Sequence, residues 1–138
     1  MIVIDTVDHL GIRVADEARS VAFYAQLGFE LVYRADNGDP VVVLRNQHDV
    51  EINLIVNAAP MSAAQNVLMD VPEKHAGYTH VALRVTSIED TVAELARLGV
   101  PLSGGPQRLG SGISLFIRDP DRNVIELRAK QHDPRKLS

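Results

Sequence analysis

The stretch Thr79-His80-Val81-Ala82-Leu83-Arg84-Val85 has a counterpart near the start of the chain, Asp8-His9-Leu10-Gly11-Ile12-Arg13-Val14. From the histidine onward, both read His, apolar, small, aliphatic, Arg, Val. The two stretches are 71 positions apart, and at this offset the match continues downstream: Val21-Ala22 aligns with Val92-Ala93, and Leu27-Gly28 aligns with Leu98-Gly99. A run of identities this long indicates one unit written twice. Each copy begins with a histidine on a predicted strand.

The first unit has the pattern strand, helix, then three strands. Alternating apolar residues predict a strand over 6–14. A helical pattern starts at Asp16 and closes at Leu27-Gly28, where glycine suits the position after a helix end. Further strands are predicted over 29–34, 41–44 and 50–56. The first two are separated by Asp36-Asn37-Gly38-Asp39, an Asn-Gly turn signal.

The second unit repeats this order after a connector over residues 58–77, which is long enough for a lid or binding loop. Ser87 is the expected N-cap of its helix and Gly99 the expected end. Residues 103–112 hold four glycines and a proline, so we expect a mobile loop there. Strands are predicted over 114–117 and 124–129, followed by a loose tail over 131–138.

These elements predict a single α+β domain spanning residues 1–138. It would consist of a module over 5–57, the connector 58–77 and a module over 78–130. Two such βαβββ modules would pair to form a curved, barrel-like mixed sheet. A length of 138 residues and a hydrophobic content of 46% suit one domain with a sizeable core.

Composition narrows the classes of function. The formal net charge of -4 does not suit an electrostatic grip on nucleic acid. No apolar run approaches the roughly 20 residues that a membrane helix needs. Asp5 and Asp8 fall where a signal peptide would be apolar, so we expect a cytoplasmic protein. With no cysteine, any metal must be held by imidazole, carboxylate, amide or water.

The two last strands can be aligned without a gap from the arginine before each turn, Arg45 and Arg118. Asn53 then falls on Glu126, and Glu51 falls on Val124. A pseudo-twofold repeat would bring His9 near His80 and Asn53 near Glu126.

Two imidazoles and a carboxylate in this arrangement predict a first-row divalent metal site formed by His9, His80 and Glu126. A lone strand histidine is more often a core or surface residue, but two at matching positions favour ligands. Glu51 lies two residues before Asn53 on the same strand face, so it is either a fourth ligand or a solvated residue of that face.

The His-bearing first strands, "HVALRV" and the terminal "RDPDRNVIEL" resemble the vicinal oxygen chelate superfamily. Its members include glyoxalase I, methylmalonyl-CoA epimerase, fosfomycin and bleomycin resistance proteins and extradiol dioxygenases. The resemblance covers residues 5–130. It implies a small-molecule substrate and one divalent metal ion, with Zn, Ni, Mn and Fe(II) all open.

The resemblance also assigns residues. His9, His80 and Glu126 match the family's metal positions. The fourth position, Glu or Gln in glyoxalase I, corresponds here to Asn53, a weak neutral ligand that could instead contact substrate. Glu51 would then stand in as ligand and base, or Glu126 would act as the base. Arg13 and Asn57 match residues that bind the glutathione of glyoxalase I, which implies an anionic substrate.

The expected function is therefore a metal-dependent lyase or isomerase acting on a small oxygenated substrate chelated through vicinal oxygens. A ring-cleaving extradiol dioxygenase is the second possibility, although those enzymes carry an additional two-unit domain. A non-enzymatic binding protein of the bleomycin-resistance type is the third, although such proteins lack the metal ligands. The resembling enzymes often exchange modules between chains, so a homodimer is expected.

Overall fold

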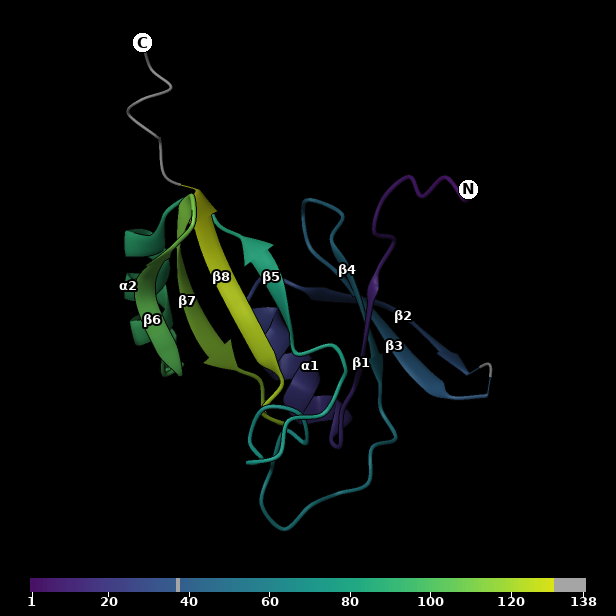
Figure 1. Cartoon of the computed structure of the whole chain (residues 1–138). Helices are drawn as coiled ribbons and strands as arrows, with labels where there is room; N and C mark the ends of the chain where they lie inside the picture. The colour runs from purple at the N-terminus through teal and green to yellow at the C-terminus, as the bar shows by residue number, and fades with distance from the viewer. Residues whose placement is uncertain (37, 131–138) are drawn as a thin grey trace. The chain divides into compact units, whose positions relative to one another are not determined.

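The computed structural model describes residues 1–36 and 38–130, and the chain divides into two compact units, one over residues 1–63 and one beginning at Ala64. The predicted tail over 131–138 and Asn37 of the predicted turn lie outside the described residues. Each unit contains one helix and a separate, open four-stranded mixed sheet (Figure 1). The predicted α+β class and the two βαβββ modules are confirmed.

The first unit has the strand order β1-β4-β3-β2. Its elements are β1 (Leu10–Arg13), α1 (Glu17–Gln26), β2 (Glu30–Asp36), β3 (Pro40–Arg45) and β4 (Glu51–Ile55). The pair β1–β4 is parallel and the other two pairs are antiparallel. The Asp16 side chain caps α1 by accepting from the Arg19 backbone N–H at 2.9 Å, as N-cap chemistry predicts.

The predicted first strand over 6–14 is too long, because regular pairing begins only at Leu10. The reason lies in its partner. β1 runs parallel to β4, and β4 starts at Glu51 after a turn, so residues before His9 have no strand beside them. His9 therefore lies at the N-terminal end of the β1–β4 pair, immediately ahead of β1.

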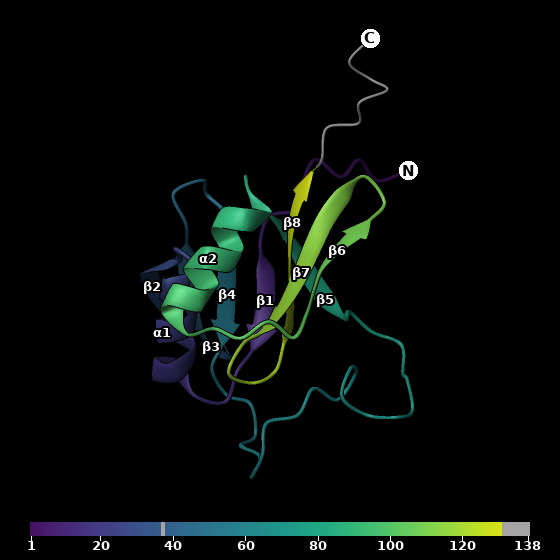
Figure 2. The same ribbon diagram turned by 90° about the vertical axis from the view of Figure 1, so that its left-hand side faces the viewer.

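The second unit repeats the topology with the order β5-β8-β7-β6. Its elements are β5 (His80–Arg84), α2 (Ile88–Leu98), β6 (Gly104–Leu109), β7 (Gly112–Arg118) and β8 (Val124–Lys130). Helix α2 packs on β7 and β8 (Figure 2). Ser87 caps it and Gly99 ends it in the left-handed conformation at φ 73°, both as predicted.

The prediction of a mobile loop over 103–112 is wrong, since most of it forms β6. This strand pairs with β7 on one side only, and an edge strand tolerates a residue that cannot donate a hydrogen bond. A register shift between Gly104 and Gln107 accommodates Pro106. Glycine and proline content alone therefore misidentified an edge strand as a loop.

Each sheet is stabilised by the burial of apolar side chains. In the first unit, Tyr24 of α1 meets Phe29 edge to face at 6.3 Å, and both are buried. Most of the remaining core comes from the central strands, and α2 contributes Leu95. Buried aliphatic residues of these strands include Val42, Val43, Leu44, Ile52 and Leu54 in the first unit and Leu115, Ile117, Ile125 and Leu127 in the second. Among the described residues no helix has the length and apolar character needed to cross a membrane.

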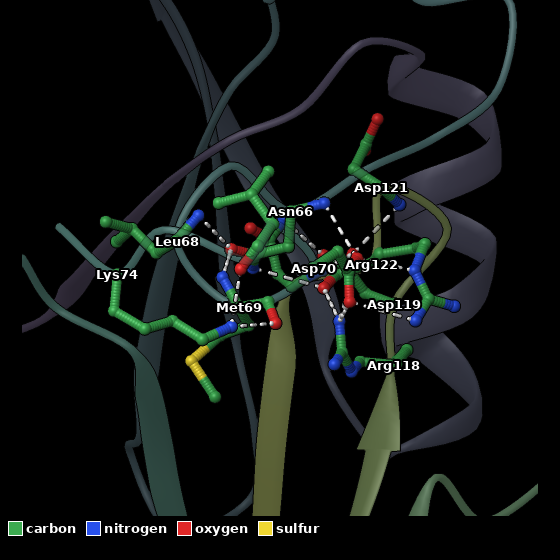
Figure 3. Close-up of polar contacts among 11 residues, drawn as sticks. Asn66, Leu68, Met69, Asp70, Lys74, Arg118, Asp119, Asp121 and Arg122 are labelled. Atoms are coloured by element: carbon green, nitrogen blue, oxygen red, sulfur yellow. Dashed lines mark hydrogen bonds and ion pairs between the residues drawn. The ribbon is translucent and has the colours of Figure 1, made fainter.

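The segment ahead of β5 is anchored within the second unit by Asp70, which bonds Arg118 at the end of β7 and Arg122 in the β7–β8 turn (Figure 3). Its carboxylate accepts from Arg122 Nε at 2.7 Å and pairs with Arg118 Nη1 at 3.1 Å. The Asn66 amide oxygen accepts two backbone N–H groups and its nitrogen donates to the Arg122 carbonyl. The second half of the connector is therefore a loop held in place by hydrogen bonds and ion pairs to Arg118 and Arg122.

Candidate metal centre

His9 and Glu51 are brought together by the parallel pairing of β1 with β4. Leu10 pairs with Ile52, so the residue before each, His9 and Glu51, lie beside one another at the start of the pair. His9 Nδ1 is 3.9 Å from Glu51 Oε2. The other carboxylate oxygen, Oε1, accepts from Arg45 Nη2 at 2.8 Å, and this hydrogen bond raises the pKa of Arg45.

Asp8, which no sequence pattern marks as a site residue, joins this pair. Its Oδ2 lies 2.6 Å from His9 Nδ1, and donor atoms of Asp8, His9 and Glu51 all lie within 4.8 Å of one another. Asp8 and His9 are exposed while Glu51 is half-buried. This is a carboxylate-rich environment for one imidazole.

His80 and Glu126 meet in the second unit. His80 is the first residue of β5, and Glu126 lies in the middle of β8 opposite Ala82. His80 Nε2 is 3.1 Å from Glu126 Oε1, and His80 Nδ1 is 2.9 Å from Thr79 Oγ1. The ring also makes an edge contact with Phe116 at 6.1 Å.

Strand register supports the gap-free alignment of the two units. Asn53 pairs with Gly11 in the first sheet, and Glu126 pairs with Ala82, the equivalent of Gly11, in the second. Asn53 and Glu126 are therefore equivalent, and Glu51 has Val124 as its equivalent. The carboxylate beside the histidine therefore lies two residues earlier on its strand in the first unit than in the second.

Asn53 itself differs sharply from its equivalent. Its Oδ1 is buried and has no hydrogen-bond partner among the described residues, whereas both oxygens of Glu126 are bonded. A buried acceptor without a partner is costly to keep. Asn53 is thus an open acceptor in the first sheet, two residues from Glu51.

Arg13 and Asn57, which the resemblance assigns to substrate, are in contact. Arg13 Nε donates to Asn57 Oδ1 at 3.0 Å, and Asn57 Nδ2 donates to Asp39 Oδ1 at 2.8 Å. Asp39 also lies 3.6 Å from Arg13 Nη2. The acid of the β2–β3 turn therefore partly neutralises the predicted anion-binding arginine, and the sequence marked it only as a turn residue.

The donor pairs fit a divalent metal ion. Two ligands each about 2.1 Å from one ion lie roughly 3–4 Å apart. The observed distances of 3.1 Å for His80–Glu126 and 3.9 Å for His9–Glu51 fall in this range. Imidazole with carboxylate is a donor set that zinc, manganese, nickel and ferrous iron all accept.

Residues 6–127 match the Glyoxalase/Bleomycin resistance protein/Dioxygenase superfamily, and the chain belongs to this superfamily. The match spans both repeats and contains each of the predicted ligands. The fold and the paired His/Glu positions are consistent with it.

Similar proteins include a lactoylglutathione lyase of Haemophilus influenzae, 31% identical over 86% of this chain and 87% of that protein. A virulence protein of Salmonella typhimurium, STM3117, is 29% identical over 91% of this chain and 84% of its own. Among solved structures, a glyoxylase/bleomycin resistance protein/dioxygenase domain from Frankia sp. EAN1pec has a TM-score of 0.75 at 19% identity. That alignment covers 94% of this chain and 100% of the other, and it shows the shared fold.

Proposed function

We propose that the chain is a metal-dependent lyase or isomerase of the glyoxalase type. Its substrate would be a small oxygenated anion, chelated through vicinal oxygens. One divalent ion would be held by His9, Glu51, His80 and Glu126, two ligands from each unit. The lactoylglutathione lyases among the similar proteins support this class of reaction.

The observation that carries the proposal is the recurrence of one donor pair. In both units a histidine at the start of the first strand lies within 3.9 Å of a glutamate on the neighbouring parallel strand. The two glutamates come from non-equivalent positions, so the pairing is not a simple consequence of the repeat. Two independent positions providing the same donors favour a functional reason.

When bound, the ion polarises the chelated oxygens and stabilises the negative charge that develops on them. Glu51 is the proposed base. Because Oε1 accepts from Arg45, a proton from the substrate would go to Oε2, which is also the proposed ligand atom and would have to leave the ion to take it. Glu126 is the second candidate, and its Oε1 faces His80. Arg13 and Asn57 would bind the anionic group, whereas the Asn53 amide oxygen would accept a hydrogen bond from a donor group of the substrate.

Metal content tests this assignment. Purified protein should contain about one divalent ion per chain, and His80→Ala should remove it. His75→Ala is the matched control, since His75 is an exposed histidine of the connector. An alanine variant at His80 that retains the ion, as measured by elemental analysis, would exclude His80 as a ligand.

The base is tested separately by Glu51→Gln, which keeps the shape of the side chain and removes the proton acceptor. Turnover of a 2-oxoaldehyde–thiol adduct should fall by at least the roughly 100-fold typical of a lost general base. Glu89→Gln, at an exposed position of α2, is the control. Unchanged turnover in Glu51→Gln would move the role to Glu126.

A ring-cleaving dioxygenase is the second candidate, favoured by the bond between Arg45 and Glu51. If that bond keeps Glu51 off the ion, then His9, His80 and Glu126 remain as a two-histidine, one-carboxylate set, which suits ferrous iron. Anaerobic loading with Fe(II) followed by oxygen uptake on catechols separates the two reactions. The presence of all these ligands argues against a binding protein without enzymatic activity.

We further propose that residues 1–138 act as one domain in a cytoplasmic homodimer. The sheet of each unit is open, with β1 and β2, or β5 and β6, as edge strands. The unpaired backbone N–H and C=O groups of an edge strand can form hydrogen bonds with a strand of a second chain. Light scattering of the purified protein tests the stoichiometry.

A further inference from the structure

Glu126 is held by two polar side chains that are not among the predicted site residues, Ser114 and Arg128. Ser114 Oγ lies 2.7 Å from Glu126 Oε2, and Arg128 Nη1 lies 2.9 Å from Ser114 Oγ. Ser114 is fully buried and Glu126 is 8% exposed. All three residues belong to the antiparallel pair β7–β8, in which Ser114 is directly opposite Arg128.

The direction of these hydrogen bonds is fixed by chemistry. A guanidinium group can only donate, so Arg128 must donate to the Ser114 oxygen. The single hydroxyl hydrogen of Ser114 is then free to donate to Glu126 Oε2. Oε2 is therefore an acceptor engaged by the protein, and Oε1 is the oxygen presented to His80.

Arg128 is itself fixed in place. Its Nη2 donates to the Leu109 carbonyl at 2.6 Å, across the neighbouring hairpin. Gly112 leaves the room that the guanidinium occupies, since a Cβ on Gly112 would stand 3.0 Å from Arg128 Cζ. The serine therefore has a rigid donor behind it.

The first unit lacks the whole arrangement. By strand register, the equivalents of Ser114, Glu126 and Arg128 are Val41, Asn53 and Ile55. The carboxylate and both of its supports are replaced together, and the amide that stands in for Glu126 has an unpartnered oxygen. At this position, therefore, Ser114 and Arg128 accompany the carboxylate, and the equivalent position of the first unit has neither the carboxylate nor the supports.

We propose that Ser114, held by Arg128, is a positioning residue that commits Glu126 to bind a divalent cation through Oε1 alone. The inference rests on the proposed function, because it assigns a role to one of the proposed ligands. A ligand carboxylate whose second oxygen is bonded to the protein loses little freedom on metal binding, and such outer contacts set affinity.

The test measures the affinity of the folded, metal-depleted protein for Zn²⁺ by competition with a chromophoric chelator. Ser114→Ala should weaken binding by roughly 10–100-fold, the usual effect of removing an outer contact. Ser20→Ala is the matched control, since Ser20 is equally buried but its hydroxyl has no partner among the described residues. It should leave Zn²⁺ affinity unchanged.

Arg128→Met gives a second, independent variant in which Ser114 is retained. Removing a nearby positive charge should by electrostatics alone strengthen cation binding. Loss of positioning should instead weaken it, so the two explanations predict opposite signs. Arg108→Met, at an exposed arginine on β6, controls for the change in net charge.

Wild-type affinity in Ser114→Ala, or tighter binding in Arg128→Met, would overturn the positioning role while leaving the proposed function intact. A wild-type protein that binds no Zn²⁺ or other divalent ion would instead contradict the proposed function. In that case the carboxyl ¹³C resonance of Glu126 in the metal-free protein decides the contact. It should move in Ser114→Ala and not in Ser20→Ala, and an unchanged resonance would exclude the hydrogen bond.

Discussion

Asn53 and Glu126 occupy equivalent positions on β4 and β8, yet their surroundings are opposite in character. Glu126 receives hydrogen bonds at both oxygens, whereas the Asn53 oxygen is buried without a partner among the described residues. An unpartnered buried acceptor costs about 1–3 kcal/mol. A residue that weakens the fold in this way is a candidate for binding a ligand group.

Replacing Asn53 by leucine should therefore separate stability from function. The free energy of unfolding, measured by urea denaturation, should stay level or rise by about 1 kcal/mol, because the unpartnered amide oxygen is removed. Turnover should fall if Asn53 contacts substrate. Lower stability would mean that the amide is bonded to water in solution, and unchanged turnover would remove Asn53 from the site.

Gly105 offers a second prediction at this scale. It has φ 71°, and a Cβ there would stand 2.5 Å from the Ser114 carbonyl oxygen. Gly105→Ala should cost about 3 kcal/mol or more, since a backbone atom cannot move aside cheaply. Gly99→Ala, with φ 73° but no atom within 4 Å of its Cβ, is the control. It should cost only the left-handed penalty of about 1–2 kcal/mol, and equal losses in urea denaturation would contradict the clash.

Among the elements, the segment ahead of β5 is held to Arg118 and Arg122 by the Asp70 carboxylate, with Asn66 adding a hydrogen bond to the Arg122 carbonyl. Asp70 is half-buried and bonds both Arg118 and Arg122, as the dashed contacts of Figure 3 show. The hydrogen bond from Arg122 holds the pKa of Asp70 well below its ordinary value. Ionisation of the Asp70 carboxyl group is therefore more favourable in the folded state than in the unfolded state.

The sign of the resulting pH dependence follows. A carboxyl with a lowered folded-state pKa stabilises the protein above its ordinary pKa of 3.8, and this contribution is lost as the pH falls below that value. Asp70→Asn should lower the free energy of unfolding by about 2–3 kcal/mol at pH 7. The gap to wild type should shrink as the pH falls below about 4. Thermal unfolding between pH 7 and pH 3 measures it, and a gap independent of pH would exclude the ion pair as its cause.

Sequence patterns located the helices better than the strands, for reasons visible in particular residues. Asp16, Ser87 and Gly99 act locally, and the predicted helix start at Asp16, N-cap at Ser87 and helix end at Gly99 are confirmed. The extent of β1 depends on where β4 begins, and β6 depends on pairing with β7. Both are contacts between distant residues. Local composition could not supply them, and it assigned β6 to a loop.

For the molecule as a whole, the repeat was the informative signal, because two copies of one pattern allow equivalent positions to be compared. The alignment that pairs Asn53 with Glu126 agrees with the strand register. The sequence could not decide between Asn53 and Glu51, because a strand places both on one face. Only the register sets Glu51 beside His9. Ser114 and Arg128 were missed because each reads as an ordinary strand residue until its partner is known.

A cation held by ligands from both units should stabilise both together, which gives a prediction for the whole molecule. An ion at 100 times its dissociation constant stabilises the folded state by about 2.7 kcal/mol, so amide protection should rise roughly 100-fold. Hydrogen exchange should show this rise in β3 and β4 as well as in β7 and β8. His9→Ala and His80→Ala should each abolish it in both sheets, because each removes a ligand of the same ion. Protection gained by one sheet alone, or lost only in the sheet that carries the substitution, would assign the ion to a single unit and contradict the four-ligand proposal.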